Sequence, residues 1–229
     1  SPPEPYGYFQ VGDSVINETW QYTGWVAPGD SIRIEASQFD INLRADSVYI
    51  FNRWSDDGDR VHIIGPITSY VDLTAFYSGQ RITIDLYLDS LVWDIGLMEL
   101  GQTRTMRDSS EMITIKNQGN VPVDLGLAMG DTSSVWCPGY FNDMNQYVLR
   151  AVFTDDIHTP TFSPHNDFVK STVDWADEVT FGPLGNAFPP VGFGDAELNL
   201  WLQFAAPTVS ASYEEETLKL TLYAKVSLP

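Results

Sequence analysis

Polar and apolar residues alternate strictly along the stretch Leu218-Lys219-Leu220-Thr221-Leu222-Tyr223-Ala224-Lys225-Val226. Successive side chains of a β-strand point to opposite faces of its sheet, so this stretch predicts a strand with one apolar and one polar row. An unpaired strand of this length would expose an edge that invites aggregation. We therefore expect the strand to lie inside a sheet.

The same period of two recurs along the chain, and residues that favour turns separate the runs. Short strands at this spacing are typical of sandwiches and barrels. We predict an all-β fold, an antiparallel β-sandwich of the jelly-roll or Ig-like kind. Residues 73–77 are the best candidate for a helical turn, and residues 165–177 fit an extended segment better than a helix. The predicted strands include residues 31–36, 48–51, 61–64, 81–88, 112–116, 147–153 and 198–204.

One elaborated domain is the first interpretation of the chain, with two small sandwiches as the alternative. Residues 1–11 form an extended N-terminal segment, and residues 12–229 form the β-sandwich domain, with a weak boundary at the polar residues 101–110. The first five residues of the segment include three prolines, and the segment continues as a short apolar strand that has no adjacent hairpin partner. Such a strand can pair with its own sheet or be donated to a neighbouring copy. The anchors of a donated strand would be Tyr6, Tyr8, Phe9 and Val11.

The composition excludes several classes of function. Twelve basic residues stand against 31 acidic ones, and the net charge of −19 disfavours binding to nucleic acid or to an anionic membrane. No apolar run is long enough for a membrane span, and one cysteine allows neither an internal disulfide nor a cysteine-based zinc site. The chain begins at Ser1 rather than Met, and with its acidity this favours a processed, secreted protein outside the cell or on its surface. Asn17 begins its one N-glycosylation sequon.

Residues 113–127 (ITIKNQGNVPVDLGL) predict two strands joined by a polar turn, in which the Asn117 side chain stabilises the turn and Gly119 takes a positive φ. This segment resembles the hairpin of secreted β-sandwich proteins, among them filament-forming surface proteins of the TasA/camelysin kind. The C-terminal strands are also similar to such proteins. The resemblance implies an extracellular location, a β-sandwich and polymerisation by strand donation, and it implies no catalytic residue.

Few residue patterns point to chemistry. The carboxylates of Asp56, Asp57 and Asp59 crowd a turn around a glycine, a pattern that would suit calcium. The weaker candidates for a metal or acid–base site are the loop with Asp155, Asp156, His158 and His165, and the pair Asp195 and Glu197. No nucleophile elbow, zinc-protease motif or phosphate-binding loop is present, and we expect no enzyme. No cofactor other than calcium is expected.

The aromatic residues fit either packing in the core or stacking on sugar rings. Seven tryptophans are spread along the chain; of these, Trp201 fits the core, and Trp54 beside the acidic turn is the candidate for an exposed sugar-stacking residue. Cys137, between Trp136 and Pro138, fits a buried small side chain. The first hypothesis is a secreted structural subunit that assembles with itself into a filament, pilus or surface layer by β-edge or donor-strand complementation. The alternative is an adhesive or carbohydrate-binding β-sandwich, and a secreted enzyme comes third.

Overall fold

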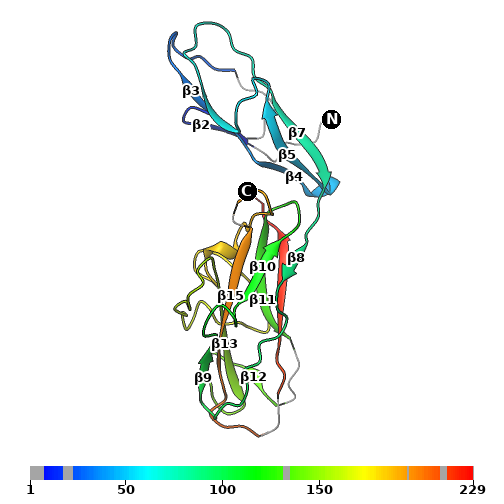
Figure 1. Ribbon diagram of the computed structural model, residues 1–229, viewed down its shortest axis with the longest axis vertical. Coiled ribbons are helices and arrows are strands. Elements are labelled where there is room, and N and C mark those ends of the chain that lie inside the picture. Colours follow the sequence, from blue (N-terminus) through cyan, green and yellow to red (C-terminus); the bar gives the residue numbers. More distant parts are fainter. Residues whose placement is uncertain (1–7, 18–22, 131–134, 195, 212–215, 229) are drawn as a thin grey trace. The chain divides into compact units, whose positions relative to one another are not determined.

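The structure is a computed structural model that describes residues 8–17, 23–130, 135–194, 196–211 and 216–228 (Figure 1). These residues form sixteen β-strands and two short 3-10 helices, which confirms the predicted all-β class. Every strand pair is antiparallel except β12 (Cys137–Pro138) with β13 (Gln146–Thr154). None of the described residues forms a helix that is long and apolar enough to cross a membrane.

The chain divides into two compact units, residues 1–82 and 83–229. This division differs from the single domain that the sequence favours, and it falls inside the predicted strand 81–88. The chain leaves β7 at Arg81 and starts a new strand, β8, at Leu86, while the polar residues 101–110 belong to the second unit. Alternation alone did not reveal the break because Ile82, Ile84 and Leu86 continue the apolar pattern across it.

The first unit has a four-stranded sheet in the order β2-β1-β3-β6 and a three-stranded sheet in the order β4-β5-β7. A shared apolar cluster joins them: Ile34, Ala36 and Trp54 are buried, and Val11, Phe51 and Tyr77 pack against them. Residues 73–77 form no helical turn, because Ala75 already starts a strand. The elements are β1 (Tyr8–Val11), β2 (Ser14–Asn17), β3 (Ile32–Ala36), β4 (Phe39–Asn42), η1 (Leu43–Ala45), β5 (Ser47–Trp54), β6 (Val61–Ile64) and β7 (Ala75–Arg81).

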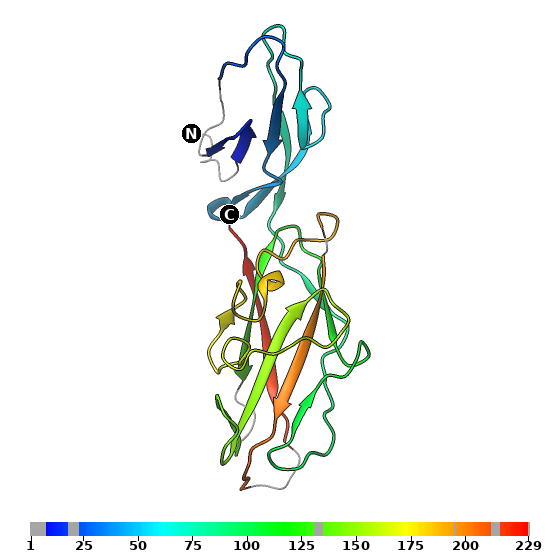
Figure 2. The same ribbon diagram turned by 90° about the vertical axis from the view of Figure 1, so that its left-hand side faces the viewer.

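The second unit has one sheet in the order β12-β13-β15-β10-β8, with β9 also paired to β15, and another in the order β14-β11-β16. Figure 2 shows β13 (yellow-green) and β15 (orange) crossing in front of β16 (red). Trp201 on β15 is fully buried, as predicted. The remaining elements are β8 (Leu86–Leu88), β9 (Thr103–Thr105), β10 (Ile113–Asn117), β11 (Val123–Gly130), β14 (Asp174–Trp175), η2 (Pro183–Gly185), β15 (Glu197–Ala205) and β16 (Lys219–Val226).

Residues 113–127 form two strands, but the strands do not pair with each other as a hairpin. Strand β10 pairs with β8 and β15, whereas β11 pairs with β14 and β16 in the other sheet. The connection between them is therefore a crossing from one sheet to the other.

Asn117 holds this crossing in place. Its fully buried amide group donates hydrogen bonds to the carbonyls of Val121 and Phe188, both at 3.0 Å, and its Oδ1 accepts one from the Gly119 amide at 3.1 Å. Gly119 does not have the expected positive φ. It is a glycine because a Cβ would lie 2.3 Å from the Thr83 carbonyl oxygen.

Strand β16 lies at the end of its sheet rather than inside it, so the expectation for Leu218–Val226 is wrong. It pairs with β11 along its whole length, from Lys219 opposite Gly130 to Val226 opposite Val123, and with no other strand of the described chain. Its alternating pattern reports the two faces of the strand, and it carries no information on whether both edges have partners.

We expect Asn117→Ala to lower the free energy of unfolding by about 2–3 kcal/mol, because buried backbone groups lose their hydrogen-bond partner. Urea denaturation of the full chain measures this loss. Gln118→Ala, at the exposed neighbouring position, is the matched control and should change the free energy of unfolding by less than about 0.5 kcal/mol. Equal effects of the two substitutions would contradict the role given to Asn117.

Candidate functional site

The acidic residues of the turn between β5 and β6 contact separate partners. Asp57 forms an ion pair with Arg53, with Nη1 to Oδ1 at 2.8 Å. His62 bridges the other two residues: its Nε2 lies 3.0 Å from Asp56 Oδ2 and its Nδ1 lies 2.7 Å from the backbone oxygen of Asp59. The imidazole packs over Gly58, where a Cβ would lie 2.5 Å from Nε2. The turn is thus closed by side chains of the chain itself.

The electrostatics of the turn follow from these contacts. Burial alone would raise the pKa of Asp56, but the hydrogen bonds from the Gly58 amide and from His62 hold the pKa below its usual value. Within the described ranges, no group of three or more His, Cys, Asp or Glu side chains comes together in a way that could hold a metal ion. The geometry therefore gives no support to calcium at Asp56, Asp57 and Asp59.

The histidine loop of the second unit is also not assembled into a site. His158 contacts Asp156, with Nδ1 to Oδ1 at 2.6 Å, and both side chains are exposed. His165 is exposed and belongs to no such group of ligands in the described chain. Glu197 forms an ion pair with Lys116 at 2.7 Å, and Asp195 lies outside the described residues.

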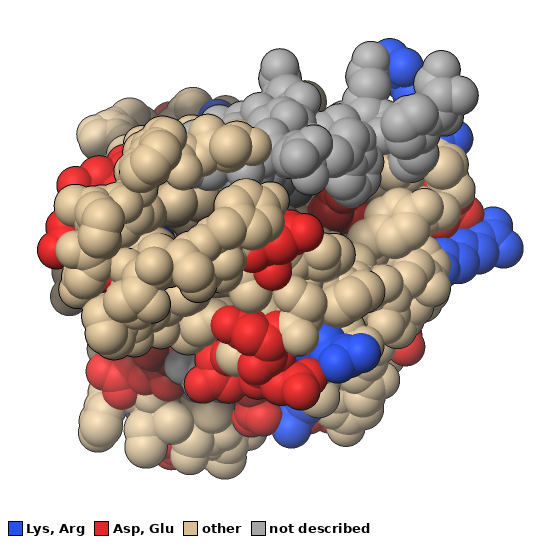
Figure 3. Space-filling view, turned by 90° about the horizontal axis from the view of Figure 1, so that it is seen from above, with Lys and Arg blue, Asp and Glu red and all other residues tan. Residues whose placement is uncertain are grey.

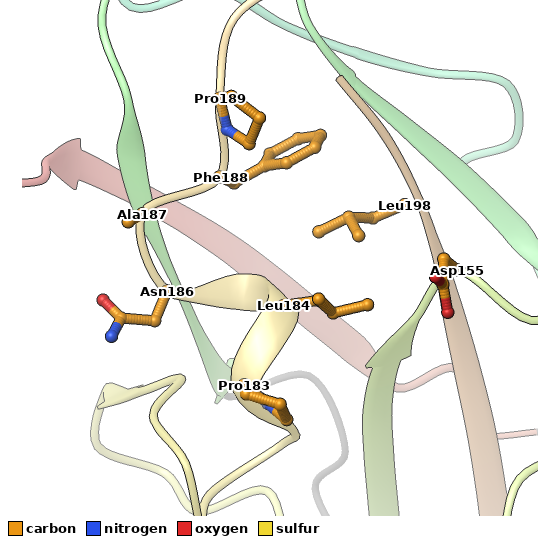
Figure 4. Close-up of a pocket in the computed structure, with 8 residues that line it drawn as sticks. All are labelled: Asp155, Pro183, Leu184, Asn186, Ala187, Phe188, Pro189 and Leu198. Atoms are coloured by element: carbon orange, nitrogen blue, oxygen red, sulfur yellow. The ribbon is translucent and has the colours of Figure 1, made fainter. Parts of the chain in front are cut away.

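A shallow hollow in the second unit is lined in part by Asp155 of this loop. It has a volume of 250 Å³ and an apolar lining that includes Leu184, Phe188 and Leu198. Figure 4 shows the Asn186 amide pointing away from these apolar side chains. A neighbouring hollow of 430 Å³ shares Asp155 and is also lined by Glu197 and Asn199. The second hollow thus places two carboxylates and one amide in its lining, and the Glu197 carboxylate is already paired with Lys116.

The predicted donor-strand anchors that the structure describes already have partners within the first unit. Strand β1 has a partner on each side, β2 and β3. The Tyr8 hydroxyl donates a hydrogen bond to Glu35 at 3.2 Å, and Val11 packs against the core cluster. The backbone of Phe9 pairs with Ile16 and Ala36. Tyr6 lies outside the described residues, as does Thr19 of the Asn17 sequon, while Asn17 itself ends β2.

Strand β16 has one edge that pairs with no described strand of the second unit. The Ser227 amide donates a hydrogen bond to the Pro122 carbonyl of the chain that leads into β11. On the other edge of β11, the Leu125 carbonyl accepts from the Ala176 amide, and the Met129 amide donates to the Lys170 carbonyl. Because amides alternate between the two edges of a strand, the odd-numbered residues of β16 bond to β11. The even-numbered ones aim their amide and carbonyl groups at the free edge, where no described strand pairs with them: Leu220, Leu222, Ala224 and Val226.

The same even-numbered residues form an apolar row that is only partly covered. Directly opposite residues of paired strands share a face of the sheet, and the β11 partners Val123, Leu125, Leu127 and Met129 are buried. The row on β16 remains partly exposed. In the part of the chain that the structure describes, no strand pairs with the backbone of this edge, and its apolar row is partly exposed.

Several aromatic side chains are exposed, but Trp54, the predicted one, is not among them. Trp54 is only 6% exposed and donates from Nε1 to the Arg60 carbonyl at 3.2 Å, so its expected exposure is wrong. A register shift between Phe51 and Arg53 places Trp54 on the same face of the sheet as Phe51, and both pack in the core cluster of the first unit. Trp25 and Tyr70 are 96% and 86% exposed, and both lie outside the strands. Cys137 is exposed rather than buried.

Sequence reasoning missed the open edge and the exposed aromatics for different reasons. The two lysines of β16 were a signal for the edge, because edge strands commonly carry lysine. Trp25 has no comparable signal, since it precedes a turn and its neighbours do not reveal whether a core covers it. No protein-family model and no curated protein matches the chain.

We expect the first unit to lose stability as the pH falls below the ordinary Glu35 pKa of 4.5. Burial alone would raise the pKa of Glu35, but hydrogen bonds from Arg60 at 2.9 Å and Arg33 at 2.7 Å hold the pKa below its usual value. A lowered pKa contributes stability above the unfolded-state value, and this contribution is lost as the pH falls through the folded-state value.

Thermal unfolding followed between pH 6 and pH 3 measures this effect. Glu35→Gln should have a lower Tm than the parent at pH 6 and a smaller drop in Tm toward pH 3. Glu178→Gln, at an exposed position of the second unit, is the matched control. An unchanged pH dependence in Glu35→Gln would show that the Glu35 ion pairs contribute nothing.

Proposed function

We propose that the protein is a secreted structural subunit that assembles with copies of itself into an extracellular filament, pilus or surface layer through open β-sheet edges. In this proposal each unit is a β-sandwich. The observation that carries it is the eight-residue strand β16, which has a partner along one edge and a partly covered apolar row beside the other. An exposed strand edge of this kind is a template for another chain.

The charge of the protein constrains how its copies can meet. Each copy would bring a net charge of −19 to an assembly, and Figure 3 shows acidic side chains gathered on one face with few basic ones. Copies of like charge repel, so contacts between them must be mainly apolar and backbone-driven. Because salt screens the repulsion over about 10 Å at 0.1 M, assembly should be stronger at physiological salt than at low salt.

The proposal places assembly at edges that remain open rather than at the N-terminal strand. Donation of Tyr8–Val11 would require β1 to leave both β2 and β3 and would uncover the core cluster at Val11. The free edge of β16 accepts a strand without breaking an existing pair. The proposed mode is therefore β-augmentation at an existing edge.

Leu222→Lys tests this proposal, because it places a charge in the apolar row of the open edge, a device that blocks edge pairing. Negative-stain microscopy and light scattering of the full chain in 10 mM and 150 mM salt should show assemblies that are larger at higher salt and absent in Leu222→Lys. Val179→Lys puts the same charge at a loop position that is 61% exposed and should assemble normally. Monodisperse parent protein under all conditions would contradict the proposal.

A carbohydrate-binding or adhesive function is the second candidate, and the exposure of Trp25 and Tyr70 is the observation that favours it. Flat aromatic faces stack on the C–H faces of sugar rings. If the unit binds glycans, Trp25→Ala should weaken retention on insoluble polysaccharides at least tenfold, as measured by pull-down. Phe141→Ala, which removes an exposed aromatic side chain from the second unit, should leave retention unchanged. Absence of binding by the parent on a broad glycan array would remove this candidate.

A further inference from the structure

We propose that the partner of the β16 edge is β16 of a second copy, paired antiparallel about a twofold axis that passes through Tyr223. This inference deepens the proposed function and rests on its premise that copies of the chain associate through β edges. Twofold pairing of like edges is the simplest way in which one surface satisfies itself, since every contact between two residues of the two copies is repeated with the copies exchanged.

The backbone restricts the registers that such a pair can adopt. Only residues that aim their amides at the free edge can bond across it, and on β16 these are the even-numbered ones. An axis between two residues would place an even-numbered residue opposite an odd-numbered one and leave the ladder unformed. The axis must therefore pass through a residue, and axes at Leu222 and at Tyr223 pair all but one residue of the strand.

The lysine charges of β16 disfavour one of these two registers. An axis at Leu222 places Lys219 directly opposite Lys225 of the second copy, twice in each dimer, and like charges directly opposite each other destabilise a sheet. An axis at Tyr223 places Lys225 opposite Thr221 and moves Lys219 beyond the end of the paired region. The lysines thus act against one register and leave the other open.

The Tyr223 register also joins the apolar rows of the two copies. Leu220 comes opposite Val226 and Leu222 opposite Ala224, all on the face that β11 shares with the core. On the outer face the two Tyr223 side chains, each 40% exposed, meet at the axis. The result is a continuous sheet of both copies with the order β14-β11-β16-β16-β11-β14.

The contact is small, and its size determines how it must be measured. One strand edge buries less surface than a stable interface of about 1,200–2,000 Å². The dimer is therefore weak in solution and gains strength when other contacts hold the copies together. A twofold contact closes on itself, so a filament that contains it needs a second contact elsewhere on the chain. Covalent trapping suits a contact of this kind.

Disulfide trapping in the full chain tests the register, after the exposed native thiol is removed by Cys137→Ser. In this background, Tyr223→Cys should form a disulfide-linked dimer on mild oxidation, at least tenfold faster than the control. Opposite residues that do not bond across the ladder have Cα atoms about 4.5 Å apart, which is within the range of a disulfide.

Thr221→Cys is the matched control, because it lies on the same strand and face and its own mate would be roughly 13 Å or more away at a rise of about 3.4 Å per residue. Thr221→Cys mixed with Lys225→Cys should form the mixed dimer in preference to either homodimer. Equal cross-linking of Tyr223→Cys and Thr221→Cys, or faster cross-linking of Leu222→Cys, would overturn the proposed axis.

Ala224→Pro separates loss of the contact from loss of the fold. The Ala224 amide faces the free edge, so proline removes a donor to the second copy without removing a bond to β11. Added to Tyr223→Cys, it should abolish the cross-link while far-UV circular dichroism and Tm stay close to those of the parent. Unchanged cross-linking in a folded Ala224→Pro protein would overturn the proposal.

The outcomes for the twofold contact and for the structural function are distinguishable. Assemblies seen by microscopy without a Tyr223→Cys dimer would overturn the β16 pairing and leave edge assembly in place. A Tyr223→Cys dimer from a protein that never forms larger assemblies would support the pairing and contradict the filament or surface layer.

Discussion

The buried amide of Asn117 is the contact on which the arrangement of the second unit depends. It holds the carbonyls of Val121 and Phe188 and the amide of Gly119 at the point where the chain leaves one sheet and enters the other. Buried backbone groups need partners, and a side chain with both donors and an acceptor supplies several of them at one place. The crossing fixes where β11 begins, and β11 in turn positions β16 along its whole length.

This dependence links a local sequence feature to the proposed assembly surface. Because β11 bonds through its odd-numbered side to Phe188, Ala176 and Lys170, its even-numbered residues are left for β16. The register between β11 and β16 then determines which amides of β16 face the free edge. A shift of one residue at the crossing would exchange the two sets and turn the apolar row of β16 away from the core.

The sequence predicted the strands well because alternation is a local property. The strands around Ile34, Ile115, Leu149 and Trp201 lie where the pattern places them, and the Asn117 side chain has the predicted role in the turn. Strand partners depend on contacts distant in the sequence, so the crossing between β10 and β11 looked like a hairpin and β16 looked like an internal strand. The exposure of Trp54 was mispredicted because a register shift between Phe51 and Arg53 turns its side chain onto the face of Phe51, and alternation along β5 does not reveal that shift.

The candidate sites depended on side-chain convergence, which composition could not give. Asp56, Asp57 and Asp59 are close in sequence, but Arg53 and His62 draw two of them to different sides of the turn. The Arg53 guanidinium and the His62 imidazole lie within a few residues of the turn and satisfy the carboxylates of Asp57 and Asp56 locally. Short-range pairing thus occupies the carboxylates of Asp56 and Asp57, while in the proposed assembly the remaining negative charge acts over longer distances between copies.

Lysine on an edge strand usually protects against pairing, and in the proposed pairing of β16 the same residues select the register. Lys219 and Lys225 occupy the outer face, Lys225 lies over the Trp175 ring and pairs with Asp124 at 3.5 Å, and the inner row carries no charge. Their spacing of six residues penalises one symmetric register and spares the next. A strand edge that is apolar inward and charged outward at this spacing is therefore closed to most pairings and open to few, as specificity by a difference in affinities requires.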